Sequence, residues 1–243
     1  METKHSLKEE IAFGNYALIK PVIKNTDFNH PVYAINWFNT NPKWIYNFYN
    51  FLAARSVFKV GGKVFFKGEM IKPFQGADED SRDMLLIVNY PSEFKFLELI
   101  KDRYFQWISI FRIIAVRKFS FGFTSRLDSE KTLENTYSNF NKSKVYVMIH
   151  FKSHQPLSNF LPQLNLITES NNIKIYFAGQ VSSLLYSGGK GGKETHVPCL
   201  FDGIILLEGD SDAHLQAVMV KENYQNLIGE FESSYIAFLK RTL

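Results

Sequence analysis

The sequence predicts an α+β protein built from two copies of one βαββαβ unit. Two observations predict this fold class. Blocks of similar sequence recur in the same order in the two halves, and each half alternates strand-like runs with amphipathic helical stretches. At 243 residues, the chain is long enough for one large domain or two small ones. Its 23 Phe, 12 Tyr and 3 Trp residues suit a core of packed sheets.

The repeat is visible in four matched blocks. Val32 begins a strand-like run that resembles the run from Val145, so Tyr33 and Tyr146 take equivalent positions. The blocks pair 32–38 with 145–151, 65–70 with 176–181, 83–88 with 202–207, and 104–111 with 224–231. A polar stretch separates the copies and has the composition of a linker. We therefore predict an N-terminal extension (1–30), a first repeat (31–127), a linker (128–144) and a second repeat (145–243).

The sequence of the first copy predicts secondary-structure elements in the order strand, helix, strand, strand, helix, strand. Alternating or continuous apolar runs indicate the strands, Gly61-Gly62 indicates a turn, and Ser92 is a predicted helix cap. The predicted ranges are 32–39, 42–55, 63–72, 84–90, 92–117 and 119–126. In both helices apolar residues recur at helical spacing, and we expect these stripes to pack on the sheet. The stripes are Trp44, Ile45, Phe48, Phe51 and Leu52, then Leu97, Ile100, Tyr104, Trp107, Ile108 and Phe111.

The second copy repeats this order with a weaker first helix. Pro162 lies inside that helix, so we expect a kink or a late start there. Ser211-Asp212 opens the second helix. The predicted ranges are 145–152, 157–169, 173–186, 203–208 and about 235–240 for the closing strand.

This order is that of a ferredoxin-like unit, whose helices cover one face of the sheet. The strands are nevertheless apolar on both faces, as Trp37, Met148 and Leu206 illustrate beside their apolar neighbours. Each exposed face therefore needs a cover. We predict that the two ferredoxin-like repeats pack sheet to sheet as an intramolecular pseudo-dimeric α+β barrel.

The first copy also resembles a known superfamily. Gly68, Gly76, the run 84–92, Tyr104 and Arg112 are similar to the small uncharacterised domains of the dimeric α+β barrel superfamily. The resemblance implies that single-domain chains usually pair, and that this chain is a tandem fusion. The superfamily includes cofactor-free monooxygenases, isomerases, haem enzymes and binding modules. In the weaker second copy, Tyr224 is matched with Tyr104, and Glu232 replaces Arg112.

Five residues are candidates for a pocket between the sheets: Tyr33, Trp37, Tyr146, His150 and Arg112. The two tyrosines either line a cavity or pack. His150, at the position of Trp37, could act as a general base or an axial ligand, or be an ordinary histidine at a strand edge. Arg112 could clamp a carboxylate, or bridge to Glu98 or Asp102 on its own helical stretch.

No motif indicates a cofactor or a metal. His196 and Cys199 are two possible zinc ligands without a second pair. The glycine-rich run 188–193 departs from the phosphate-binding loop, because Ser187 takes its first glycine position and Glu194 follows the lysine. We expect that run to be a flexible connection, and we expect no cofactor.

We therefore expect a protein that binds, or binds and transforms, a small apolar or aromatic molecule between the sheets. Whether it is an enzyme stays open. One alternative is a protein-interaction module with a filled core, which should show a large exposed apolar patch. Another is a haem-binding barrel using His150 or His154. A net charge of +4 and the lack of an apolar span predict no nucleic-acid partner, no membrane partner and a cytoplasmic location. The chain could be a monomer or a homodimer, and its extension should pack on a barrel edge or close one end.

Overall fold

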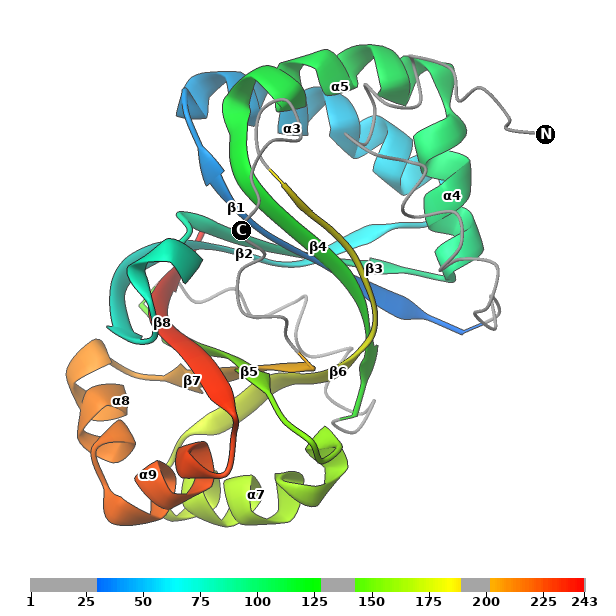
Figure 1. Cartoon of the computed structure of the whole chain (residues 1–243). Coiled ribbons are helices and arrows are strands. Elements are labelled where there is room, and N and C mark those ends of the chain that lie inside the picture. Colours follow the sequence, from blue (N-terminus) through cyan, green and yellow to red (C-terminus); the bar gives the residue numbers. More distant parts are fainter. Residues whose placement is uncertain (1–29, 128–142, 189–201, 243) are drawn as a thin grey trace. The chain divides into compact units, whose positions relative to one another are not determined.

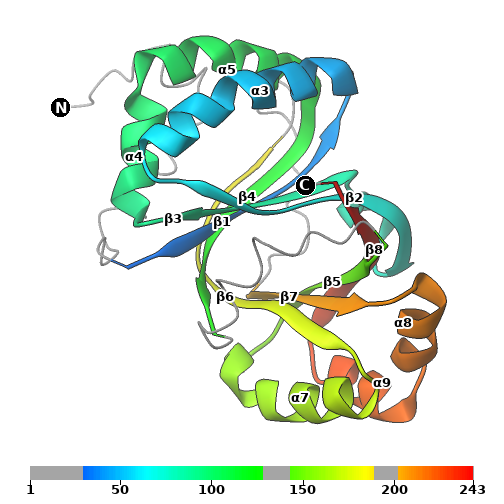
Figure 2. The ribbon, with the colours of Figure 1, turned by 180° about the vertical axis from the view of Figure 1, so that it is seen from behind.

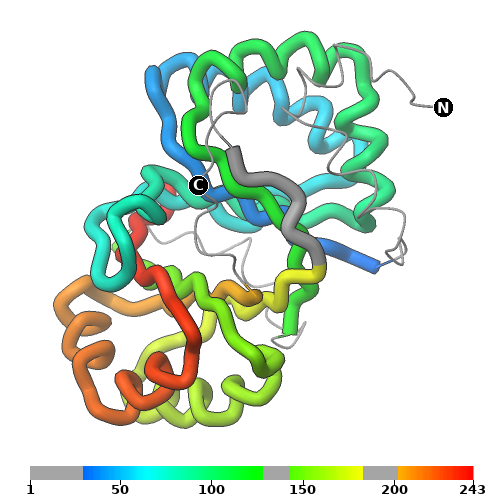
Figure 3. The backbone as a smooth tube through the Cα atoms, viewed as in Figure 1, coloured from blue at the N-terminus to red at the C-terminus, as the bar shows by residue number. Residues whose placement is uncertain are grey.

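The computed structural model describes residues 30–127, 143–188 and 202–242, traced in Figure 3. The extension before His30, most of the predicted linker and most of the glycine-rich connection lie outside these residues, as do His196 and Cys199. Among the described helices, none is both long and apolar enough to cross a membrane.

The first repeat follows the predicted order, with one helix divided in two (Figure 1). Asp102 ends one helix, and its carboxylate caps the next by accepting a hydrogen bond from the backbone N–H of Phe105 in that helix's first turn. The predicted stretch 92–117 is therefore two helices followed by the start of a strand. The elements are β1 (Val32–Thr40), α3 (Lys43–Lys59), β2 (Lys63–Gln75), the 3₁₀ turn η1 (Asp78–Asp80), β3 (Met84–Tyr90), α4 (Glu93–Lys101), α5 (Arg103–Ala115) and β4 (Val116–Arg126).

The second repeat has the same order. The late start predicted at Pro162 is confirmed, because a 3₁₀ turn precedes the helix and the proline lies in its first turn. Ser211 caps its helix by accepting a hydrogen bond from the His214 N–H. The elements are β5 (Val145–Lys152), η3 (Leu157–Asn159), α7 (Leu161–Ser170), β6 (Lys174–Gly188), β7 (Gly203–Gly209), α8 (Asp212–Met219), α9 (Glu222–Gly229) and β8 (Ser233–Arg241).

The strands hydrogen-bond in the order β1-β3-β2-β8-β5-β7-β6-β4, and the sheet closes into a barrel. Each repeat contributes its strands in the ferredoxin-like order, with its first and third strands adjacent. The predicted fold class is confirmed by this order.

Equivalent hydrogen bonds relate the two repeats. The backbone N–H of Leu127, after β4, donates to the carbonyl oxygen of Ala178 on β6 over 2.9 Å. The N–H of Thr242, after β8, donates to the carbonyl oxygen of Lys67 on β2 over 2.8 Å. The end of each repeat therefore bonds the second strand of the other, so the internal duplication extends to the strand register.

The chain forms two compact units, each with its own core. Of the described residues, unit 1 comprises 30–65, 82–123 and 183–188, and unit 2 comprises 66–81, 124–127, 143–182 and 202–242. The division falls within β2, β4 and β6, so these units are not the sequence repeats, whose boundaries stay a prediction. In unit 1, α3, α4 and α5 cover one face of the strands, and in unit 2, α7, α8 and α9 do so (Figures 1 and 2).

The predicted stripe on α3 is right only for Ile45 and Leu52, which pack against the core, while its other three members are exposed. Tyr46, Tyr49 and Ala53 face the core, whereas Trp44 and Phe51 are 70% and 78% exposed. Apolar residues occur almost all round this helix, so the spacing did not identify the buried side.

The same error affects the end of the second predicted stripe. Tyr104 and Trp107 lie exposed on α5, and Phe105 is buried instead. Counted from the start of each helix, Phe105 of α5 takes the position of Tyr224 in α9. The sequence match of Tyr104 with Tyr224 is therefore one residue out of register.

Candidate functional site

Tyr33 and Trp37 lie on the same side of β1. Val32, Ala34 and Phe38 belong to the core beneath the helices of unit 1, so the alternating residues point to the opposite face. Both candidate side chains are buried there, and the Tyr33 ring meets the Phe65 ring edge-on at 5.4 Å.

Arg112 lies on the other side of the strands of unit 1. Its guanidinium sits 5.2 Å from the centre of the Phe119 ring, which belongs to the core beneath the helices. It therefore shares no sheet face with Tyr33 and Trp37. The carboxylates proposed as its partners are held by lysines: Glu98 by Lys95, and Asp102 by Lys59.

In unit 2, the face of the strands opposite α7, α8 and α9 carries the other two candidates. We call it the helix-free face. Tyr146 and His150 occur on it because Val147, Ile149 and Phe151 face the helices. Its other members, by strand register, are Met148, Ile204, Leu206, Glu208, Tyr235, Ala237, Leu239 and Arg241.

His150 and His154 do not come together. His150 is 0% exposed between its cross-strand neighbours Ile204 and Tyr235, whereas His154 lies on the surface and pairs with Glu232. An imidazole that holds haem iron has to face a space large enough for the haem, and His150 is fully enclosed by protein. These residues do not fit haem, and the described residues contain no group of three metal-ligating side chains.

Tyr146 belongs to a polar group at the partly exposed edge of the helix-free face. Its hydroxyl donates a hydrogen bond to a carboxylate oxygen of Glu208 over 2.8 Å. Its ring meets the ring of Tyr176 at 5.1 Å and that of Phe66 at 5.0 Å. Phe66 also contacts the Tyr176 ring, at 5.8 Å, so three aromatic rings pack together beside one carboxylate.

Two arginines meet at Tyr176. The Arg241 guanidinium lies 5.5 Å from the centre of the Tyr176 ring, and Arg241 is 7% exposed. Arg126, which is half-buried, donates from Nη2 to the Tyr176 carbonyl oxygen over 3.5 Å and lies 5.8 Å from the centre of the Phe177 ring. We name Arg126, Tyr146, Tyr176, Glu208 and Arg241 the arginine–tyrosine cluster.

Tyr146 of this cluster stays protonated at neutral pH. Burial raises the pKa of Tyr146, and the neighbouring Glu208 carboxylate raises it further, while a hydrogen bond from Arg241 acts in the opposite direction. The hydroxyl is therefore a hydrogen-bond donor to Glu208 and not a base. Two guanidinium groups and one carboxylate leave the cluster with a net positive charge.

The sequence predicted Tyr146 and missed the rest of the cluster. Arg126-Leu127 and Arg241-Thr242 close the two repeats at equivalent places, and this signal could have identified the arginines as a pair. Glu208 faces Tyr146 across β5 and β7, whereas Asn89 faces Tyr33 across β1 and β3. Only the strand register reveals this difference between the repeats.

No family model matches the chain, and no curated protein matches it. Among solved structures, an anthrone oxidase-like protein is 11% identical, with 89% of this chain and 93% of that chain covered and a TM-score of 0.51. This match and the closed order of the strands agree. The chain has the dimeric α+β barrel fold.

Two further solved structures are similar at lower TM-scores, which support no inference about this chain. A protein of unknown function from Rhodopseudomonas palustris is 21% identical, with 46% of this chain and 94% of that chain covered and a TM-score of 0.44. A heme-binding protein from Thermus thermophilus is 9% identical, with 87% and 91% covered and a TM-score of 0.43. The dimeric α+β barrel fold hosts different activities, so the function has to be argued from the residues of this chain.

Proposed function

We propose that the chain binds a small aromatic or apolar molecule with an acidic group at the arginine–tyrosine cluster of unit 2. The observation that carries this is the meeting of Arg126 and Arg241 at Tyr176, on the edge of an otherwise apolar face. Ligand sites combine apolar walls with a few placed polar groups. Here the aromatic walls are Phe66, Tyr146 and Tyr176.

The charges suit an acidic group on the ligand. A guanidinium matches a carboxylate geometrically, because it offers parallel N–H donors to the two oxygens. Glu208, held by Tyr146, works against a bound anion. Arg126 and Glu208 are half-buried, so solvent reaches part of each side chain, in contrast to the enclosed His150.

Binding of benzoate and of uncharged benzyl alcohol, measured by ligand-observed NMR, tests this proposal. Benzoate should bind more tightly. Arg241→Met should weaken benzoate binding by about tenfold, with little effect on benzyl alcohol, whereas Glu208→Gln should tighten benzoate binding. Arg117→Met removes a positive charge in unit 1 and serves as the control.

The opposite signs of Arg241→Met and Glu208→Gln separate a loss of charge from a general loss of structure. Equal affinity for the charged and the uncharged probe would overturn the proposal. So would an absence of binding of both probes at millimolar concentration.

A further inference from the structure

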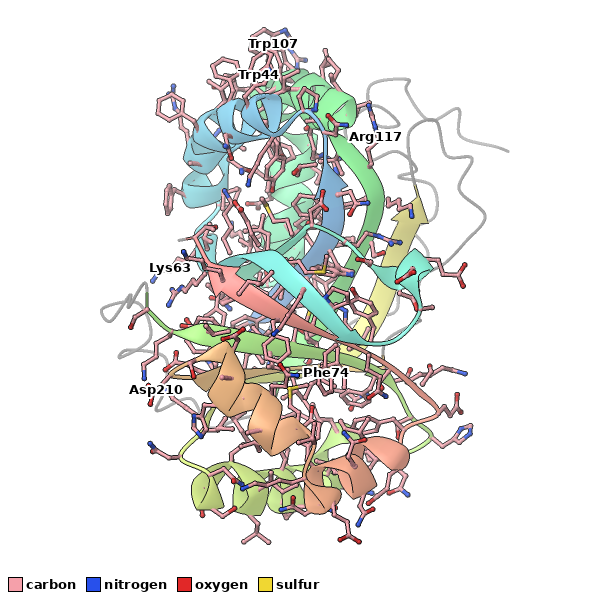
Figure 4. All side chains as sticks on the ribbon, turned by 90° about the vertical axis from the view of Figure 1, so that its left-hand side faces the viewer. Trp44, Lys63, Phe74, Trp107, Arg117 and Asp210 are labelled. Carbon is pink, nitrogen blue, oxygen red and sulfur yellow. The ribbon has the colours of Figure 1, made fainter. Side chains whose placement is uncertain are left out.

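The helices of unit 1 carry an aromatic surface that the fold does not use. Trp44, Phe48 and Phe51 lie at helical spacing on α3, and Tyr104 and Trp107 lie on the neighbouring α5. Leaving out Phe58 at the end of α3, we call the exposed large residues of these two helices the aromatic surface: Trp44, Phe48, Phe51, Tyr104, Trp107, Ile110 and Ile114. Figure 4 shows Trp44 and Trp107 projecting outward from the helices.

The two helices present one continuous surface. The Phe48 ring of α3 meets the Phe111 ring of α5 edge-on at 5.3 Å, and Phe111 meets the Trp107 ring at 6.2 Å. With about 200 Å² for each large side chain, the exposed fractions amount to roughly 750 Å². An exposed patch of this size exceeds the largest patch on a typical monomer and marks an interaction surface.

The second repeat shows that the fold does not require this surface. Its equivalent helices are shorter, and the large exposed apolar residues on the described helices of unit 2 and their ends are Leu166 and Val220. The aromatic surface is therefore present on the helices of the first repeat and absent from the described helices of the second.

The charges on the two helices indicate the partner. The exposed basic residues are Lys43 and Arg55 on α3 and Arg103 on α5, and neither helix contains an acidic residue. Lys59 pairs with Asp102, and Arg112 lies against the buried Phe119 ring, so neither is counted here. A second copy facing this surface would bring like charges together. An anionic surface that accepts Trp and Phe side chains fits both the apolar and the basic residues.

We propose that the aromatic surface docks unit 1 on the headgroup region of an anionic lipid bilayer. Trp44, Phe51 and Trp107 enter the interface between headgroups and acyl chains, and the exposed basic residues of the two helices attract the lipid charge. This is peripheral binding through side chains, and it needs no membrane-spanning segment. The sequence predicted no membrane partner from a small net charge, which conceals this local excess of basic residues.

Sedimentation of the full chain with vesicles tests the proposal. We compare phosphatidylcholine vesicles with vesicles containing about one-third phosphatidylserine. The chain should bind the anionic vesicles, and added salt should weaken binding. Replacing Trp44, Phe51 and Trp107 by Ser should lower the partition coefficient at least tenfold, and Arg55→Glu with Arg103→Glu should abolish the preference for anionic lipid. Leu166→Ser with Val220→Ser is the matched control at exposed apolar positions of unit 2 and should change nothing.

Tryptophan fluorescence gives a second reading. Trp37 is buried, so Trp44 and Trp107 supply the signal that responds to lipid, and their emission should shift to the blue on anionic vesicles and be quenched by brominated acyl chains. The proposal is overturned if anionic vesicles neither bind the chain nor shift its emission. It is also overturned if the chain is a dimer in solution and the triple Ser variant makes it a monomer, because the occupant is then a second copy.

Discussion

Tyr224 lies in the core beneath the helices of unit 2, where its side chain is 0% exposed. Within the described parts of the chain, its hydroxyl has no hydrogen-bond partner. A buried polar group without a partner loses its bonds to water and gains none in return. The hydroxyl of Tyr224 therefore opposes folding, while its ring contributes to the core.

Tyr224→Phe should raise the free energy of unfolding by about 1 kcal/mol, because the ring stays and the unbonded hydroxyl goes. Urea denaturation measures this. Tyr146→Phe is the control with the opposite sign, since that hydroxyl donates to Glu208 and its loss should lower stability.

The pH dependence of this variant provides an independent check. Burial raises the pKa of Tyr224 above its ordinary value of 10.0. Below pH 10 this difference in pKa does not change the stability. As the pH rises above that value, the unfolded chain deprotonates at Tyr224 before the folded chain does, and the folded state loses stability. Tyr224→Phe should therefore lose less stability above about pH 10 than the natural chain. If both chains lose stability in parallel, the hydroxyl is not buried as described.

At the scale of elements, the second strand of each repeat carries the same local device. Gly68 follows Phe66 on β2, and Gly179 follows Phe177 on β6, two residues apart in both cases. A Cβ at Gly68 would lie 2.6 Å from the Phe66 ring, and one at Gly179 would lie 2.7 Å from the Phe177 ring. Each phenylalanine ring therefore lies over its glycine, and each strand needs that glycine for this packing.

Gly179→Ala should lower the free energy of unfolding by about 1–3 kcal/mol, because the Phe177 ring is enclosed and has to move. Gly229→Ala is the matched control at the end of α9. A Cβ there meets nothing within 4 Å, and alanine reduces the freedom of the unfolded chain, so stability should rise slightly. Thermal melting of both variants measures the difference. Equal melting temperatures would contradict the packing of Phe177 over Gly179.

The scale of the whole molecule shows what the sequence could predict. The duplication, the order of elements and the late start at Pro162 were readable, because strand alternation, caps and proline act locally. The buried side of α3 was not readable, because apolar residues surround that helix. The same ambiguity hid the aromatic surface.

The candidate site was readable only in part. Tyr146 stood out through its equivalence to Tyr33, and its place on a strand predicted one of two faces. The partners Glu208, Tyr176 and Arg241 come from three other strands, and their meeting depends on a register set by pairing between distant segments. Local pattern carries no information about such pairing, so the cluster needed the structure.

Three ion pairs join elements of unit 2 and make its stability depend on pH. Asp210 pairs with Lys144, Asp212 with Lys72, and Glu232 with Lys152. A hydrogen bond from its lysine lowers the pKa of each carboxyl below the ordinary values of 3.8 for Asp and 4.5 for Glu. The three pairs therefore stabilise the folded chain at pH values above the ordinary pKa values. This stabilisation is lost as the pH falls through the lowered pKa values of the folded chain.

We expect the melting temperature to fall as the pH drops below about 4, and less steeply in high salt, because these pairs are exposed and screened. Replacing Asp210 and Asp212 by Asn and Glu232 by Gln should flatten this dependence while costing little near pH 7. The control replaces Glu222 and Glu230, which lie exposed on α9 and at its end, by Gln. Unlike the control, the triple variant removes carboxylates that a lysine holds in the folded chain. If the control nevertheless flattens the pH profile of the melting temperature as much as the triple variant does, net charge governs the acid response and these three pairs do not.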